Sequence, residues 1–183
     1  MKRLSLFVAG LMLTGCATMP AGSPQATAEL KNARGEGVGT ASLWEDANGV
    51  RLAAQVRGIP AGRHGIHIHA VGKCDPPDFT TAGGHYNPGG MKHGLKSAGG
   101  PHAGDLPNLD VGTDRTGRLE PVTKVVTLGP GPTSLFDPDG SALVIHANPD
   151  DETTDPTGNS GGRIACGVIV RASPPPARPS TGY

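Results

Sequence analysis

The strongest constraint on the fold is a set of short segments in which apolar and polar residues alternate. The alternation recurs in ATAELK, GTASLW, VRLAAQV, GIHIHA, RLEPVTKVV, ALVIHA and RIACGVIV. A period of two residues is typical of β-strands, and no segment shows a sustained helical period with caps. Asn48-Gly49 and the DRTG segment at 114–117 are turn signals between such runs. The sequence therefore predicts an all-β fold, an antiparallel sandwich or barrel.

Composition supports long loops and argues against a nucleic-acid surface. The chain has 183 residues, enough for one domain with appendages, and contains 29 glycines, 18 prolines and 3% aromatic residues. Its 16 basic and 16 acidic residues balance, whereas nucleic-acid-binding domains carry a clustered basic excess. We therefore expect no nucleic acid among its partners.

The N-terminal region is typical of an exported protein. Lys2 and Arg3 precede an apolar run at 4–13 that is too short to span a bilayer. The LTGC motif ending at Cys16 resembles the lipobox of bacterial lipoproteins, whose cysteine is acylated. We expect a signal peptide at 1–15 and a lipoprotein anchored to a membrane, in the periplasm or cell envelope, through Cys16. The alternative is an ordinary signal peptide cleaved farther on.

Two low-complexity segments flank the expected domain at 26–172. Segment 16–25 consists largely of small residues with two prolines, which is typical of a flexible stalk. Segment 173–183 is a Pro-rich tail without apolar core residues. One folded domain is therefore expected between a stalk and a tail.

The three cysteines fit an exported protein with a single disulfide. Export to an oxidising compartment favours pairing, and three cysteines leave one over. If Cys16 carries the lipid, Cys74 and Cys166 are the pair that remains. We expect a disulfide between them.

Two long segments interrupt the strand pattern. They run from Val71 to roughly Asn108 and from Asn148 to Gly162, and both are polar and rich in glycine and proline. Loops of that length inside a compact domain are usually functional or held by a ligand. No P-loop, dinucleotide fingerprint or hydrolase elbow accompanies them.

All seven histidines lie between positions 64 and 146, and their grouping favours metal binding. His67 and His69 project from the same face of an expected strand, although such a pair alone is more often a solvent-facing feature. The candidate copper ligands are His67, His69, His146 and a fourth imidazole, and the candidate zinc ligands are His85, His93, His102 and Asp105. Both sets are complete only if one histidine is shared.

Six motifs in order give the chain a specific resemblance. GIHIHA, AGGHYNP, KHG, PHAGDLPN, ALVIHA and GRIACGVI closely resemble the Cu/Zn superoxide dismutase family over roughly 26–172, and the segment after Cys74 is similar to the secreted bacterial form. The resemblance implies an eight-stranded antiparallel Greek-key barrel or sandwich, with two long loops that bind the metals and form the active site. This family is a standard example of β-sandwich architecture.

The resemblance also implies a role for each site residue. The copper ligands would be His67, His69, His85 and His146, and the zinc ligands His85, His93, His102 and Asp105, with one copper and one zinc per subunit. His85 would then bridge the two metals. Arg163 resembles the arginine that guides the anion, Asp150 the carboxylate that connects a copper histidine to a zinc histidine, and His64 a histidine that braces the loops.

The implied activity is dismutation of superoxide by cycling of copper between Cu(II) and Cu(I). The alternative is an envelope lipoprotein that buffers or delivers copper or zinc without turnover. One departure concerns the second loop, where Pro156 stands in place of a steering lysine and Thr157 is expected to line the channel. The sequence leaves the choice between a monomer and a homodimer open.

Overall fold

The structure, a computed structural model, describes residues 22–173. The expected signal peptide, the lipid site at Cys16 and nearly all of the Pro-rich tail lie outside this range. Within it, no helix has the length and apolar character needed to cross a membrane. The only helical element there is a short 3-10 turn, η1 (Thr80–Ala82). The remaining regular structure consists of β-strands.

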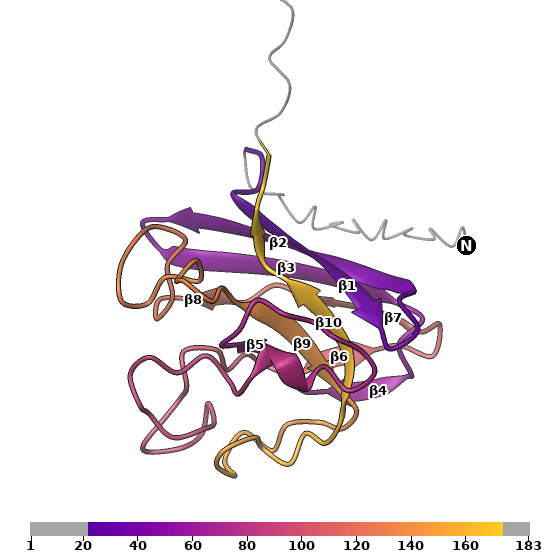
Figure 1. Ribbon diagram of the computed structural model, residues 1–183. Helices are drawn as coiled ribbons and strands as arrows, with labels where there is room; N and C mark the ends of the chain where they lie inside the picture. Colours follow the sequence, from indigo (N-terminus) through magenta and orange to yellow (C-terminus); the bar gives the residue numbers. More distant parts are fainter. Residues whose placement is uncertain (1–21, 174–183) are drawn as a thin grey trace, which may run out of the picture.

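The described part of the chain contains eleven strands. They are β1 (Ala26–Asn32), β2 (Gly37–Asp46), β3 (Gly49–Arg57), β4 (Gly62–His64), β5 (Ile66–His69), β6 (Leu109–Val111), β7 (Thr116–Leu119), β8 (Val122–Thr123), β9 (Ala142–His146), β10 (Arg163–Val168) and β11 (Val170–Arg171). They form one antiparallel sheet, in which nine strands follow the order β4-β6-β7-β3-β2-β1-β10-β9-β5, while β8 pairs with β3 and β11 with β1. Because β4 and β5 end this order and only Gly65 separates them, the sheet curls into a nearly closed barrel (Figure 1).

The eleven strands correspond to eight longer ones with short interruptions. Gly65 divides β4 from β5, Glu120 and Pro121 divide β7 from β8, and Ile169 divides β10 from β11. Pro121 has no N–H to donate to a ladder, so a break there is expected. The connections after β3 and β8 each pass to a strand that is not their neighbour, as in a Greek key. The all-β, eight-stranded Greek-key prediction is confirmed.

The longest hairpin joins β2 to β3 at a turn that the sequence predicted. Asp46 pairs with Gly49 across the turn, and the Asp46 carboxylate accepts a hydrogen bond from the Asn48 N–H at 2.7 Å. Gly49 has φ 121°, and a Cβ there would lie 2.4 Å from the carbonyl oxygen of Thr123. Glycine is therefore required at this position.

Alternation along the strands places one side chain in two inside the barrel. Leu43 on β2 and Leu52 on β3 are opposite each other and fully buried, and Ile66 on β5 and Ile145 on β9 form a second such pair. These side chains belong to one apolar core that runs through the barrel. Burial of this core stabilises the sheet, and Tyr86, Ala103 and Leu106 of the first long loop also pack into it.

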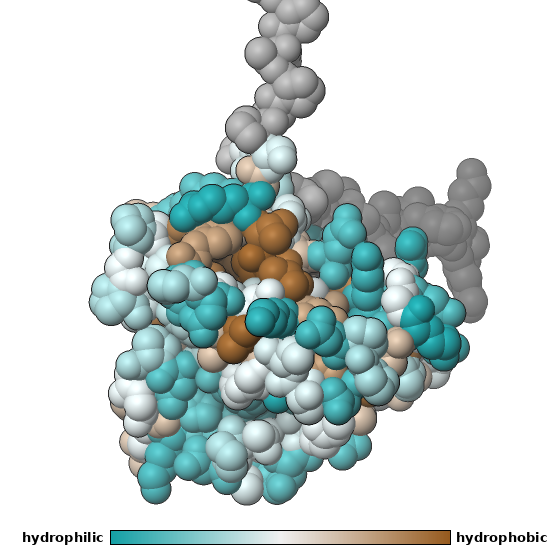
Figure 2. All heavy atoms as spheres, viewed as in Figure 1, coloured by the Kyte–Doolittle hydropathy of each residue, from teal (hydrophilic) through white to brown (hydrophobic). Residues whose placement is uncertain are grey.

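The two long loops lie on the side of the barrel away from β2 and β3, below the sheet in Figure 1. Their surface is mostly hydrophilic, whereas apolar residues in the same view gather over the strands (Figure 2). The predicted disulfide between Cys74 and Cys166 is confirmed, with a Cα–Cα distance of 5.6 Å. It joins the first loop to β10 beside a small apolar cluster that includes Phe79, which is fully buried. The PPDFTTAGG segment therefore covers the disulfide.

Candidate metal centre

All seven histidines are buried, and six of them meet between the barrel and the two long loops. His67 and His69 come from β5, and His146 ends the neighbouring strand β9. The other three, His85, His93 and His102, come from the first long loop. Three groups of potential metal ligands result, each with its ligand atoms within 4.8 Å of one another; two hold four residues, and the third, His67, His93 and Asp150, lies between them. The first set is His67, His69, His85 and His146, and the second is His85, His93, His102 and Asp105.

In the first set, hydrogen bonds determine which nitrogen of each ring faces inward. The Nδ1 atom of His69 lies 2.9 Å from the carbonyl oxygen of Gly83, and the Nδ1 atom of His146 lies 3.2 Å from that of Gly161. A carbonyl can only accept, so each Nδ1 carries the proton. The two Nε2 atoms are then unprotonated, yet they face each other at 3.3 Å. Two lone pairs at this distance repel unless a cation lies between them.

The same reasoning applies to His67 and His93, which share one carboxylate. The Nε2 atom of His67 donates to one oxygen of Asp150 at 2.7 Å, and the Nε2 atom of His93 donates to the other at 3.0 Å. Each ring therefore presents an unprotonated Nδ1 to the centre. Both Nδ1 atoms are buried and make no hydrogen bond, and the same is true of Nε2 of His85. Buried polar atoms without partners are rare, and ligation of a metal accounts for all three.

The second set converges on one oxygen of Asp105. The Nδ1 atoms of His85 and His93 lie 3.0 Å from its Oδ1 atom, and Nδ1 of His102 lies 3.5 Å away. The Oδ2 atom accepts the backbone N–H groups of Gly94 at 2.8 Å and His102 at 2.9 Å. Burial alone would raise the pKa of Asp105, but its hydrogen bonds outweigh burial and lower it. Three nitrogens and an ionised carboxylate suit tetrahedral zinc.

His85 belongs to both sets. Its Nδ1 atom faces Asp105, and its Nε2 atom is the unpartnered one that lies on the side of the first set. The ring stacks on His67 with centroids 4.0 Å apart. The sequence allowed both sets to be complete only if they shared one histidine. His85 is that histidine, and it lies between the two sets.

Burial keeps His67, His69 and His146 neutral and able to bind metal. Desolvation lowers the pKa of His67 to about 4, that of His69 to about 2 and that of His146 to about 3. Each ring is therefore unprotonated on its inner nitrogen at neutral pH, which is the form that binds a metal.

Asp150 is held in place by groups that sequence reasoning did not identify. Its backbone N–H donates to the Asn108 side chain at 2.7 Å, and the Asn108 amide donates back to the carbonyl of Asp150 at 2.9 Å. Gly158 leaves room for the carboxylate, since a Cβ there would lie 1.8 Å from its Oδ1 atom. No local feature of the sequence distinguishes Asn108 from other asparagines in polar loops.

Arg163 lies at the mouth of a hollow of about 380 Å³ that leads to the first set. Its guanidinium donates to the carbonyl oxygens of Phe79 and Gly83, both at 2.6 Å. Burial lowers the pKa of Arg163 and the charge of Asp78 opposes this, but an arginine remains cationic in proteins. The hollow is also lined by His69, His85, His146, Thr157 and Asn159. The structure thus places Thr157 where the sequence suggested and adds Asn159.

His64 lies outside both sets. Its Nδ1 atom is 2.8 Å from the carbonyl oxygen of His146 and its Nε2 atom is 2.9 Å from that of Pro60. Both ring nitrogens are therefore used to connect the end of β9 to the segment before β4.

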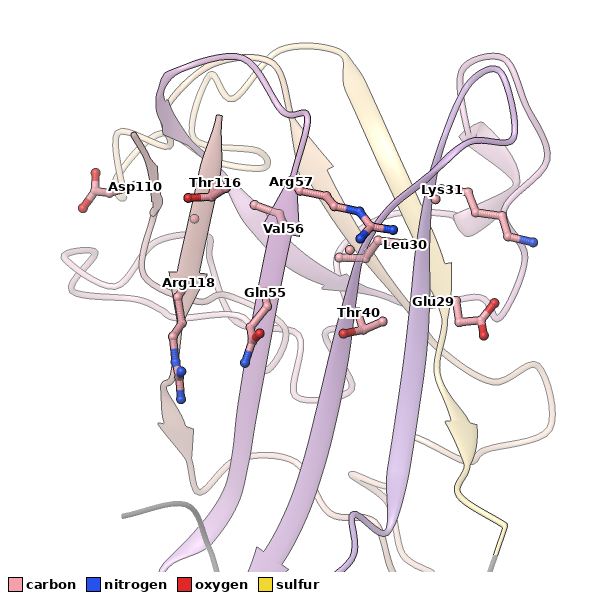
Figure 3. A pocket seen from close by; sticks show the side chains of 13 residues that line it. Glu29, Leu30, Lys31, Thr40, Gln55, Val56, Arg57, Asp110, Thr116 and Arg118 are labelled. Atoms are coloured by element: carbon pink, nitrogen blue, oxygen red, sulfur yellow. The ribbon is translucent and has the colours of Figure 1, made fainter. Parts of the chain in front are cut away.

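A larger hollow, about 780 Å³, lies elsewhere on the molecule. It is on the outer face of β1, β2, β3 and β7, and side chains of Glu29, Lys31, Arg57 and Arg118 surround it (Figure 3). These four side chains do not form a buried cluster, and no histidine lines the hollow. We therefore place the chemistry at the smaller hollow.

The fold and the two ligand sets together define a class: β-barrel proteins with two buried groups of potential metal ligands that share one histidine. Residues 38–169 match the family model described as copper/zinc superoxide dismutase. The chain belongs to the copper/zinc superoxide dismutase family, as its motifs predicted. Copper and zinc are the metals that this family implies.

Several relatives support this membership. "Superoxide dismutase [Cu-Zn] 2" of Aquifex aeolicus is 46% identical over 171 residues, which cover 92% of this chain and 99% of the relative. "Superoxide dismutase [Cu-Zn]" of Deinococcus radiodurans is 40% identical over 177 residues, which cover 90% of this chain and 93% of the relative. The crystal structure of a SOD-like protein from Bacillus subtilis matches with a TM-score of 0.76 at 38% identity, over 79% of this chain and 97% of the other.

Proposed function

We propose that the protein is a superoxide dismutase, which converts two superoxide anions and two protons into O₂ and H₂O₂. The observation that carries the proposal is the pair of complete ligand sets that share His85 beside a hollow containing Arg163. One relative, 40% identical, bears the name superoxide dismutase-like protein. Membership of the family is therefore not sufficient, and the proposal rests on the site itself.

We assign one metal to each ligand set. His67, His69, His85 and His146 would hold copper, because an all-imidazole set suits Cu(II). His85, His93, His102 and Asp105 would hold zinc, which accepts nitrogen and oxygen ligands in a tetrahedral arrangement. When bound, copper supplies the one-electron chemistry, and zinc supplies a fixed positive charge.

The residues around the hollow would bind the substrate and move its protons. Arg163 presents a planar cation at the entrance, and its two carbonyl contacts hold it in one orientation toward the anion. Whenever it is not bound to metal, Nε2 of His85 would hold a proton and pass it to the peroxide product, because no other group is bonded to it and its ring lines the hollow. Superoxide dismutase is itself a standard example of near diffusion-limited association guided by charge.

Asp150 and His64 would act through the ligands. Asp150 fixes the orientation and protonation of His67 and His93 at once, so it couples the copper set to the zinc set. His64 holds the backbone of His146. Neither side chain lines the hollow, so their roles are to position other residues.

We also propose export and membrane anchoring. The Cys74–Cys166 disulfide supports an oxidising compartment, which agrees with the apolar N-terminal run and the LTGC motif. On this proposal residues 1–15 are removed, Cys16 is acylated, 16–25 is a stalk for the domain at 26–172, and 173–183 is a tail. Mass spectrometry of the mature N-terminus tests it: an acylated Cys16 is expected, and a start beyond Cys16 would overturn the anchor.

The proposed activity is tested by measuring dismutation by the purified protein after loading with copper and zinc. We expect fast, cyanide-sensitive turnover that His146→Ala abolishes. His146 is chosen because only the copper set contains it. Stoichiometric metal binding without turnover would overturn the enzyme and favour the alternative, a protein that buffers or delivers metal.

A further inference from the structure

The second long loop reaches the zinc set through more than one carboxylate. Asp150 is one of them, and its side chain is almost completely buried. Five residues later, Asp155 approaches the same set from the solvent side, with its side chain 49% exposed. Its Oδ1 atom accepts a hydrogen bond from the backbone N–H of His93 at 2.8 Å. The same oxygen lies 3.7 Å from Nε2 of His102.

The position of Asp155 relative to His102 resembles that of Asp150 relative to His93. In each case the carboxylate lies at the outer Nε2 atom while Nδ1 faces the zinc set. A negative charge at Nε2 favours the form of the ring that carries its proton there and leaves Nδ1 free to bind metal. The 3.7 Å contact is longer than a hydrogen bond, so its effect on His102 is electrostatic and weaker than that of Asp150.

The backbone contact gives Asp155 a second effect on the same set. By accepting the His93 N–H, it fixes the main chain of one zinc ligand while its charge acts on the ring of another. Within the described residues, Nε2 of His102 has no hydrogen-bonding partner, so Asp155 is the acidic group that faces it. His102 would otherwise be the least supported histidine of the set.

We propose that Asp155 is a positioning residue for the zinc site, one that raises zinc affinity through His102 and the backbone of His93. The inference rests on the proposed metal assignment. It adds a carboxylate from the second loop whose role is confined to zinc, because the contacts of Asp155 include no residue found only in the copper set. Loss of an outer partner of a metal ligand typically costs 10- to 100-fold in affinity. Given its exposure, we expect about tenfold for Asp155.

The test compares Asp155→Asn and Asp155→Ala with the parent protein. The amide of Asp155→Asn can still accept the His93 N–H but lacks the charge, whereas Asp155→Ala loses both. We expect the dissociation constant for zinc, measured by competition with a chelator, to rise about tenfold in Asp155→Asn and further in Asp155→Ala. Copper affinity and the visible spectrum of bound Cu(II) should be unchanged, while Co(II) bound in place of zinc should show a shifted spectrum.

Asp139→Asn is the matched control, since Asp139 is an exposed carboxylate in a different loop and belongs to neither ligand set. Zinc affinity of Asp155→Asn within twofold of the parent would overturn the inference. The inference would also be overturned if metal-free Asp155→Asn lost as much thermal stability, relative to the metal-free parent, as the metal-loaded variant loses relative to the loaded parent. The role of Asp155 would then be in folding of the loop. If the parent protein itself binds no zinc, the proposed metal assignment fails first.

Discussion

The strands β1 to β3 and the two long loops are stabilised by different kinds of interaction. The hairpin of β2 and β3 buries leucine, valine and alanine side chains and pairs in continuous register from Gly39 to Asp46. In the loops, by contrast, the buried groups are largely polar: His85, His93, His102, Asp105, Asn108, Asp150, Glu152 and Ser160. Apolar burial is non-directional and tolerates small shifts, whereas polar burial is favourable only when every group finds its partner.

Because the barrel core is apolar and the loops depend on paired polar groups, we expect the barrel to form without metal and the loops to become fully ordered only with it. Several of the loop's ring nitrogens are paired only when a cation lies between them, as for Nδ1 of His93 and Nε2 of His85. Hydrogen bonds between the loops, such as that of Asn108 with Asp150, supply part of the remaining order. Substitutions in the two regions should therefore have separable consequences.

The largest effect is expected from His85→Ala, which removes a ligand from both sets. Dismutation should fall on the order of 10⁴-fold, as for loss of a central member of a catalytic group. The far-UV circular dichroism of the barrel should be retained, because His85 lies outside the strands. Loss of the strand signal together with activity would show that the two regions are not separable.

Removal of the metals should loosen the loops selectively. A ligand at 1,000 times its dissociation constant contributes about 4 kcal/mol to stability, so chelation should lower the melting temperature. Hydrogen exchange should rise in segments 71–108 and 148–162 and stay slow in β2 and β3. Uniform loss of protection across the molecule would contradict the comparison.

Leu52→Ala in the barrel core should destabilise the fold without changing the metal sites. Leu52 is 1% exposed and lies opposite Leu43. Truncation of such a side chain costs about 3 kcal/mol through lost burial and the cavity that remains. Urea denaturation should show this loss, while the zinc dissociation constant of the folded protein stays the same. A parallel fall in zinc affinity would mean that the core and the loops are coupled.

Arg163→Ala should reduce kcat/KM about 100-fold, since it removes the cation that lines the hollow. Copper and zinc contents measured by mass spectrometry should remain at one each, because Arg163 is in neither ligand set. Arg163→Lys provides the control, and it should recover only part of the activity, because lysine cannot reproduce the two carbonyl contacts.

The smallest effect is expected from Arg57→Ala on the outer face of the sheet. Arg57 borders the larger hollow of Figure 3 and is exposed. Surface substitutions of this kind usually change stability by less than about 0.5 kcal/mol. Neither activity nor metal content should change, and a clear loss of either would show that this hollow takes part in function.

Local pattern was sufficient to predict most of the strands, whereas the complete ligand sets came from the resemblance to the family. The alternation in VRLAAQV and ALVIHA depends on neighbours two residues apart, so β3 and β9 could be identified from the chain alone. Asn159, Asn108 and Asp155 were not predicted as site residues. Their contacts are with groups brought close by folding, and an asparagine or aspartate in a polar loop has no local feature that distinguishes it.

Residue types and short-range spacing are enough to predict the all-β class, the family and the residues available as ligands. The nitrogen of each ring that faces the centre of its ligand set is selected only in the folded structure. The hydrogen-bond acceptor is Gly83 for His69, Gly161 for His146 and Asp150 for His67, at separations of 14, 15 and 83 residues. A neutral imidazole can carry its proton on either of two nitrogens, and a hydrogen-bond acceptor favours one of them; here the acceptor comes close only when the chain has folded.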